Sequence, residues 1–175
     1  MKRLLCVIDY QNDFVTGSLG FEKAKSLDRN IASLIKDYRA SGDTVAFTLD
    51  THYEDYLSTS EGKMLPIKHC IEGTNGHKLY GETAKLAQNG DPIFIKNTFG
   101  SDKLYEFIKQ NKFDKITFAG VVSNICVISN AILAKTASPE SEITVNAQCV
   151  ASNDESLNTA ALTVMRSLQI IIEGE

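Results

Sequence analysis

The feature that most restricts the fold of this sequence is the regular alternation of short apolar segments with amphipathic ones. The apolar segments are rich in β-branched residues, as strands buried on both faces are, and they lie at residues 3–8, 43–49, 92–96, 115–119, 142–147 and 168–172. The amphipathic segments repeat apolar residues at helical spacing, which predicts helices at residues 28–40, 101–111, 124–136 and 154–167. This alternation predicts a three-layer α/β/α sandwich with a six-stranded, mainly parallel, doubly wound sheet.

Size and charge limit the classes of protein to which the chain can belong. Its 175 residues suit one ordinary domain and leave no room for a second of normal size. Hydrophobic residues make up 43% of the chain and charged residues 23%, so there is enough apolar side chain for a core and a disordered chain is excluded. The net charge of −4 disfavours nucleic acid and anionic membranes as partners. We expect a single domain over residues 1–175 that binds neither.

The N-terminus and the cysteines indicate where the protein works. The apolar run Leu4–Ile8 is shorter than the roughly 7–15 residues of a signal-peptide core. No segment approaches the roughly 20 apolar residues of a membrane span. The four cysteines are widely spaced in a chain large enough to have its own core, which is typical of free thiols in a reducing compartment. We expect a cytoplasmic location.

Chemically active side chains follow the ends of several predicted strands. In a doubly wound sheet, ligands bind beyond the carboxyl ends of the strands. The residues that reach this edge are Asp9, Asp50, His52, Lys96 and Cys126. Each of these residue types alone is more often a turn, surface or core residue. Their convergence on one edge favours a functional site.

Cys126 lies in a segment suited to nucleophilic chemistry. Ser123 or Asn124 is a natural N-cap, which places Cys126 in the first turn of the predicted helix. Unpaired N–H groups and the helix dipole stabilise a thiolate there. The same N–H groups could bind the oxyanion that forms when the thiolate attacks a carbonyl.

The segment at about residues 50–90 is long for a connection and holds all three histidines, which indicates a functional insertion. In Asp50-Thr51-His52 the outer two side chains share a face, because residues two apart in a strand point the same way. With Glu61 and His69, they form a donor set suited to Zn²⁺, Mn²⁺ or Fe²⁺. The alternative is a polar loop with surface histidines.

Four segments of the chain resemble the isochorismatase-like cysteine hydrolases, and among them the nicotinamidases. They are VIDYQNDF, DTHYEDYLSTSEGKMLPIKHC, IFIKNTFGS and AGVVSNICV, in the order expected for the family. The first and the last are highly specific together. The resemblance covers most of the chain, from Asp9 to Cys126 and on into the closing helices and strand.

This resemblance implies a catalytic triad. Cys126 would be the nucleophile, Asp9 the base that takes its proton, and Lys96 their positive partner. The family carries a cis peptide just before the thiol, which corresponds to Val121–Val122. The backbone N–H groups of Val122 and Cys126 would form the oxyanion hole.

The resemblance also implies a metal site and a substrate pocket. The ligands would be Asp50, His52 and His69. Some nicotinamidases carry a further histidine after the second ligand, but this stretch has none; another branch uses a glutamate further along, and Glu61 matches its position as the fourth ligand. We expect one divalent ion, zinc in the first place, with manganese or iron as alternatives.

The substrate pocket departs from the family pattern. The family motif W-P-x-H-C places a tryptophan on the pyridine ring, whereas this chain has Leu65 before its proline and one residue more before His69. We therefore expect Leu65 and the aromatic Phe14 to bind the substrate.

The function implied by the resemblance is metal-assisted amide hydrolysis. Nicotinamide would be converted to nicotinate and ammonia through a thioester. The alternatives are a hydrolase of another small amide or carbamoyl compound, and a non-catalytic metal- or thiol-binding protein on the same scaffold. Isochorismate hydrolysis is disfavoured, because true isochorismatases lack the cysteine and the metal cluster. The expected partners are a small amide substrate and further copies of the chain in a homo-oligomer.

Overall fold

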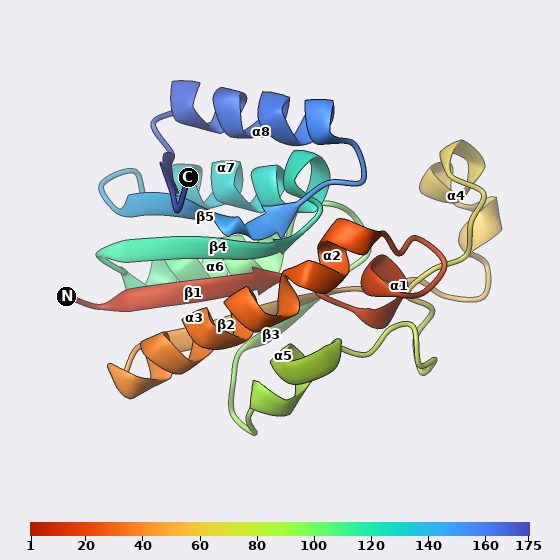
Figure 1. Cartoon of the computed structure of the whole chain (residues 1–175), viewed down its shortest axis with the longest axis horizontal. Coiled ribbons are helices and arrows are strands. Elements are labelled where there is room, and N and C mark those ends of the chain that lie inside the picture. Colours follow the sequence, from red (N-terminus) through yellow and green to blue (C-terminus); the bar gives the residue numbers. More distant parts are fainter.

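The computed structural model describes residues 1–175 and contains one sheet of six parallel strands (Figure 1). The strands are β1 (Arg3–Ile8), β2 (Thr44–Asp50), β3 (Ile93–Lys96), β4 (Lys115–Val121), β5 (Glu142–Ala151) and β6 (Ile171–Glu173). Their order across the sheet is β3-β2-β1-β4-β5-β6, and every neighbouring pair is parallel. The predicted six-stranded α/β fold is confirmed.

The order of the strands fixes where a ligand can bind. The chain runs from β1 outward through β2 to β3, and then returns to the other side of β1 for β4, β5 and β6. The direction of winding therefore reverses between β1 and β4. The carboxyl ends of two such strands leave a crevice between their following loops, and that crevice is the usual binding place in this class of fold.

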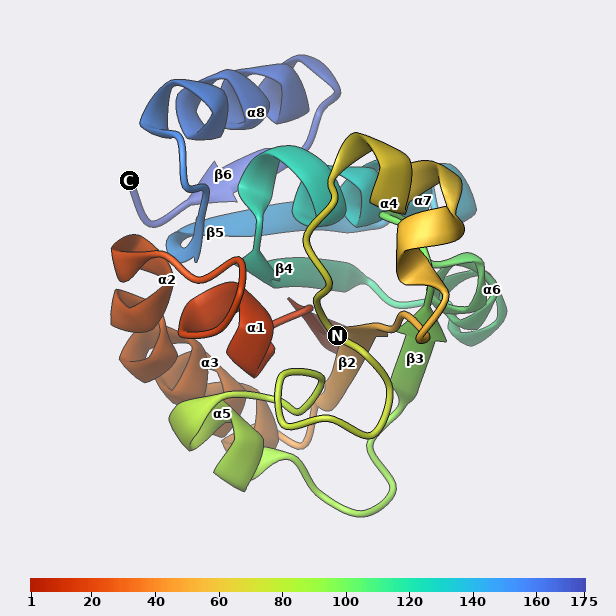
Figure 2. The same ribbon diagram turned by 90° about the vertical axis from the view of Figure 1, so that its right-hand side faces the viewer.

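Helices cover both faces of the sheet (Figure 2). One face carries α6 (Asp102–Asn111), α7 (Ile128–Ala137) and α8 (Glu155–Ser167), and the other carries α2 (Glu22–Ser26), α3 (Asp28–Ala40) and α5 (Gly81–Leu86). Each face has its own apolar core.

The sequence of β1 shows why this strand lies in the centre. Leu4, Cys6 and Ile8 belong to the core under α6, α7 and α8. Leu5 and Val7 belong to the core under α2 and α3. Successive residues of a strand point to opposite faces, so a strand covered by helices on both sides must be apolar at every position.

Most predicted elements agree with the structure, although β5 runs four residues beyond the expected 142–147 and two further elements differ from their predictions. The helix expected at 28–40 is α3, with the same bounds. The strand expected at 168–172 is shorter and later, because Leu168 and Gln169 close α8: the N–H of Leu168 donates to the Val164 carbonyl, and Gln169 has a φ of 63°.

The second difference concerns the helix expected at 124–136. It begins as a π-helical turn over Ser123–Val127 and continues as α7. Val122 precedes this turn and no side chain caps it, so the predicted capping by Ser123 or Asn124 is wrong. The Ser123 hydroxyl instead donates to Asn158 Oδ1 at 2.7 Å, which draws it toward α8.

The segment at about residues 50–90 is built from short helices that cross the carboxyl ends of the strands. It contains a 3₁₀ turn (Tyr56–Ser58), α4 (Ser60–Met64) and α5. Figure 2 shows α4, the loop that follows it and α1 (Asn12–Val15) at the end of the sheet that faces the viewer. Gly62 allows α4 to pack on the 3₁₀ turn, because a Cβ there would lie 2.0 Å from the Tyr56 carbonyl oxygen.

All four cysteines are free and buried. None of the helices combines the length and the apolar character that crossing a membrane requires.

Candidate active site

The residues expected at the carboxyl edge of the sheet do meet there. Asp9 follows β1, Asp50 ends β2, Lys96 ends β3, and Cys126 lies in the π-helical turn after β4. All four are buried: the exposed fraction is 0% for Asp9, 4% for Asp50, 5% for Lys96 and 6% for Cys126. The carboxyl ends of the strands lie at the end of the sheet that faces the viewer in Figure 2.

Lys96 connects the groups of the predicted triad. Its ammonium group lies 2.7 Å from Asp9 Oδ2 and 3.7 Å from Cys126 Sγ. The same group donates to the Thr98 carbonyl at 2.9 Å, which holds the lysine side chain in place from the loop after β3. The sequence prediction that these three residues come together agrees with this geometry.

Asp9 is fixed from its backbone and from its side chain. Its φ of 46° lies in the left-handed region, which few residues other than glycine adopt, and it turns the chain sharply at the end of β1. The Asp9 N–H donates to Thr48 Oγ1 at 3.1 Å, and the Thr48 hydroxyl donates to Asp9 Oδ1 at 2.6 Å. One carboxylate oxygen is thus held by Thr48, and the other faces Lys96.

The charges at this site favour a thiol that keeps its proton until a base removes it. Burial raises the pKa of Cys126 well above its ordinary value, and the Asp9 carboxylate raises it further, although Lys96 opposes both effects. Burial also raises the pKa of Asp9, which Lys96 partly offsets. For Lys96, burial lowers the pKa, but Asp9 and Cys126 more than compensate, so the pKa is raised and the lysine stays charged.

This result corrects the expectation of a thiolate stabilised by the start of a helix. Cys126 lies in a π-helical turn, not in the open first turn of a long α-helix. Besides burial, the carboxylates of Asp9 and Asp50 raise its pKa, and the ammonium group of Lys96 lowers it. The raised pKa of Asp9 makes its carboxylate a stronger base, which suits it to accept the proton of the thiol.

The loop that carries the thiol depends on a close approach of two strands. Gly120 has a φ of 113°, and a Cβ at this position would lie 2.0 Å from the Ile8 carbonyl oxygen of the neighbouring strand. Only glycine fits there. The next peptide bond but one, Val121–Val122, is cis, as the resemblance implied.

Three of the four expected metal ligands form a compact buried group. Donor atoms of Asp50, His52 and His69 all lie within 4.8 Å of one another. Asp50 Oδ2 is 3.1 Å from His52 Nε2 and 3.4 Å from His69 Nε2. The second ring nitrogen of His69 lies 2.8 Å from the Ile67 carbonyl oxygen, which orients Nε2 toward the group.

Glu61 extends this group. Its Oε1 lies 3.7 Å from His52 Nε2 and 3.8 Å from His69 Nε2, and its side chain is 21% exposed. Burial raises the pKa of Glu61, and the neighbouring Asp50 raises it further. Two imidazole nitrogens and two carboxylates are a donor set that suits Zn²⁺, Mn²⁺ or Fe²⁺, so these side chains fit a divalent ion.

Asp50 joins the two halves of the site. Its Oδ2 faces the imidazoles, while Oδ1 lies 3.3 Å from the ammonium group of Lys96. Burial raises the pKa of Asp50, but hydrogen bonds with His52 and His69, together with Lys96, outweigh this and hold the pKa below its usual range. The carboxylate therefore stays ionised between the triad and the donor group.

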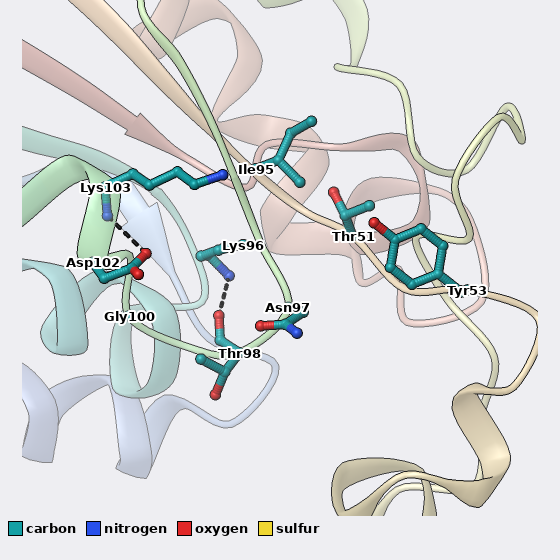
Figure 3. A pocket seen from close by; sticks show the side chains of 9 residues that line it. All are labelled: Thr51, Tyr53, Ile95, Lys96, Asn97, Thr98, Gly100, Asp102 and Lys103. Atoms are coloured by element: carbon teal, nitrogen blue, oxygen red, sulfur yellow. Dashed lines mark hydrogen bonds between the residues drawn. The ribbon is translucent and has the colours of Figure 1, made fainter.

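Two cavities adjoin the site on the side of β3. The first, of about 460 Å³, reaches Lys96 and Lys103 (Figure 3). The second, of about 350 Å³, reaches His52 and Glu61. The two share four lining residues, Thr51, Tyr53, Asn97 and Thr98.

Neither of the residues expected to bind substrate lines these two cavities. The Phe14 ring packs on His69 with 5.5 Å between the ring centroids, so it borders the donor group. Leu65 contacts the site through its backbone. Its N–H donates to the Glu61 carbonyl at 2.8 Å, and its carbonyl accepts from the hydroxyl of Tyr56 at 2.9 Å, whose ring lies on His52.

Comparison with known proteins agrees with this architecture. A family model described as the isochorismatase domain matches residues 3–175. The chain belongs to the isochorismatase family.

Other members of the isochorismatase family are similar over nearly the whole chain. A Bacillus subtilis (strain 168) protein called uncharacterized isochorismatase family protein PncA is 30% identical in an alignment of 174 positions that covers 93% of this chain and 93% of the other. The crystal structure of nicotinamidase/pyrazinamidase PncA from Bacillus subtilis has a TM-score of 0.88 and 27% identity. That of pyrazinamidase/nicotinamidase from Streptococcus mutans UA159 has a TM-score of 0.87 and 30% identity. Both comparisons cover 98% of this chain and 99% of the other. Within the isochorismatase family, the chain lies in the nicotinamidase branch.

Several residues that support the site of this family member were not singled out from its sequence. Thr48, which holds Asp9, precedes Asp50 by two positions in β2, and strand alternation could have placed the two on one face. Gln11 accepts from the Asp50 N–H at 2.8 Å and donates to the Asp50 carbonyl at 2.9 Å. Asn130 bonds the Cys126 carbonyl from one helical turn further on. No spacing in the sequence indicates the bond between Gln11 and Asp50.

Proposed function

We propose that this protein, an amide-bond hydrolase of the isochorismatase family, converts nicotinamide to nicotinate and ammonia. The observation that carries the proposal is the buried contact of Lys96 with Asp9, Cys126 and Asp50 at once. It joins a nucleophile and its base to a group of metal-ligand side chains within one crevice of the fold.

The first half of the reaction makes a thioester. Asp9 takes the proton of the Cys126 thiol as the sulfur attacks the amide carbonyl carbon. The carbonyl oxygen becomes an oxyanion, which the backbone N–H groups of Val122 and Cys126 would stabilise. The tetrahedral intermediate then expels the amide nitrogen, which takes the proton from Asp9 and leaves as ammonia. Lys96 stays charged throughout and stabilises the anionic forms of both partners.

The second half consumes one water molecule. Asp9, again ionised, takes a proton from the water molecule, and the oxygen of that water attacks the thioester carbonyl carbon. The carbon–sulfur bond breaks, and the Cys126 sulfur recovers a proton. One amide and one water thus give one carboxylic acid and one ammonia, and the enzyme returns to its starting state.

The divalent ion would be held by Asp50, His52, His69 and Glu61. Zinc is the first choice for this ion, and manganese and iron are the alternatives. When bound, this ion supplies a Lewis-acidic centre beside the triad, suited to the ring nitrogen of a pyridine. Phe14 lies against His69 and would contact an aromatic substrate near this centre. Leu65 is the substitute for the aromatic residue of the family motif.

The four free cysteines support a reducing compartment, and we extend the proposal to a cytoplasmic enzyme that works as a homo-oligomer.

The test is the release of ammonia from a panel of small amides: nicotinamide, pyrazinamide, benzamide and a carbamoyl amino acid. We expect nicotinamide and pyrazinamide to be hydrolysed, and benzamide, which lacks a ring nitrogen, to be a much poorer substrate. Release from the carbamoyl compound alone would reject nicotinamide and select the other substrate class. Without release from any amide, the protein would be a binding protein on this scaffold.

A further inference from the structure

Asn130 is a buried polar residue of α7 whose side chain contacts two separate parts of the candidate site. It is 1% exposed. Its Nδ2 donates to the Cys126 carbonyl at 2.8 Å and to the Phe99 carbonyl at 3.0 Å. Its Oδ1 accepts from the Ser101 N–H at 3.0 Å. The three bonds use both donors of the amide group and one of its acceptor positions.

These bonds join the segment that carries the nucleophile to the segment that carries the lysine. Cys126 belongs to the π-helical turn before α7. Phe99 and Ser101 belong to the loop that begins after Lys96, and Lys96 itself donates to Thr98 within that loop. Apart from the bonds of Asn130, no side-chain hydrogen bond connects the Phe99–Ser101 segment with the turn that carries Cys126.

The distance that this connection controls is short and sensitive. Lys96 Nζ and Cys126 Sγ are 3.7 Å apart, although Lys96 ends β3 and Cys126 lies in the π-helical turn after β4. The charge of the lysine acts on the sulfur only at close range, and a displacement of about 1 Å at a reacting group can cost about 100-fold in rate. A residue that fixes both loops against each other therefore sets the position of the lysine relative to the nucleophile.

We propose that Asn130 is a positioning residue for the triad, holding the Lys96 loop against the Cys126 turn. The inference rests on the proposed function for its kinetic consequence, but not for its geometric one. Asn130 touches neither the substrate nor the reacting atoms, and it acts through the backbone of both segments.

A serine at this position separates the bridge from a local effect on the helix. Cys126 is four residues before position 130, and a serine hydroxyl in a helix can donate to the carbonyl four residues back. Asn130→Ser therefore keeps a bond to the Cys126 carbonyl but is too short to reach the loop. Asn130→Ala loses all three bonds. Ser141→Ala is the matched control, because Ser141 is also buried and donates to the Phe113 carbonyl. Ser141 lies at the amino ends of the strands, far from the candidate site.

The experiment measures kcat and KM for the best amide of the panel, the melting temperature, and a crystal structure of each variant. We expect both Asn130→Ala and Asn130→Ser to lower kcat by about 10- to 100-fold, with KM nearly unchanged. In their crystal structures, the distance from Lys96 Nζ to Cys126 Sγ should increase by about 0.5 Å or more, which exceeds the tolerance of a catalytic constellation. Ser141→Ala should melt earlier and keep its kcat.

Three results would overturn the inference. If Asn130→Ser kept the kcat of the parent, the bond to the Cys126 carbonyl would be sufficient, and the bonds to the loop would have no kinetic role. A kcat loss in Ser141→Ala equal to that of Asn130→Ala would make the effect one of general stability. An unchanged Lys96–Cys126 distance in Asn130→Ala would reject the bridge even if the parent hydrolysed no amide, in which case the proposed function would fail separately.

Discussion

Replacing Lys96 by methionine removes a buried cation from among three groups that depend on it. The lysine side chain is 2% exposed, and it lies 2.7 Å from Asp9, 3.3 Å from Asp50 and 3.7 Å from the sulfur of Cys126. Methionine has a similar length and no charge, so the variant Lys96→Met changes the electrostatics more than the packing. Asp9 then remains fully buried without its ionic partner.

The cost of this change follows from the burial. Removing one member of a buried ion pair typically costs about 3–5 kcal/mol. We expect the lower end, about 3 kcal/mol, because Asp9 can take up a proton: burial raises its pKa, and the loss of Lys96 removes the opposing effect. For a chain of this size, about 3 kcal/mol lowers the melting temperature by about 6–12 °C. Turnover should fall by about 100-fold or more, as when another charge-stabilising group is lost from an active site.

The assay combines calorimetry with the release of ammonia, and Lys115→Met is the control. Lys115 lies 2.9 Å from Glu142 and 2.6 Å from Glu173, but its side chain is 19% exposed and lies at the opposite end of the sheet. Its removal should cost about 1 kcal/mol or less and leave turnover unchanged. If Lys96→Met kept both the melting temperature and the turnover of the parent, Lys96 would not be the positive partner of Asp9 and Cys126.

The remaining predictions concern the nucleophile, the base and the metal ligands. Cys126→Ala should retain less than about a hundredth of the activity and melt close to the parent, since losing a covalent nucleophile costs several orders of magnitude in rate; higher residual turnover would exclude a thioester. Asp9→Asn should be similarly inactive, because an amide cannot accept the thiol proton, and a kinetic profile like that of the parent would assign the base to another group. Glu61→Ala should lower the zinc content after dialysis and kcat/KM together, with added metal restoring part of the activity. Glu54→Ala is the control, because the Glu54 side chain is 84% exposed and pairs only with Lys68; equal zinc content in the two variants would reject Glu61 as a ligand.

The fold could be predicted from the sequence because its signals are local. A strand such as β1, apolar at each position from Leu4 to Ile8, requires cover on both faces, and the helical spacing in Asp28–Ala40 gave α3 with its bounds. The alternation of the two patterns then requires a parallel sheet, and parallel strands bring their carboxyl ends to one edge. The meeting of Asp9, Lys96 and Cys126 follows from that topology together with the family motifs.

Only the tertiary structure decided how segments far apart in the chain contact one another. The raised pKa of Cys126 depends on burial and on Asp9, 117 positions earlier in the sequence, and so could not be read from the residues around the thiol. The double contact of Asp50, with Lys96 on one oxygen and the imidazoles on the other, depends on how the long insertion folds back over β2. The bridge made by Asn130 depends on the approach of two loops. Periodicity records which face of an element is buried, whereas these contacts arise from where the loops close, and no local pattern encodes that closure.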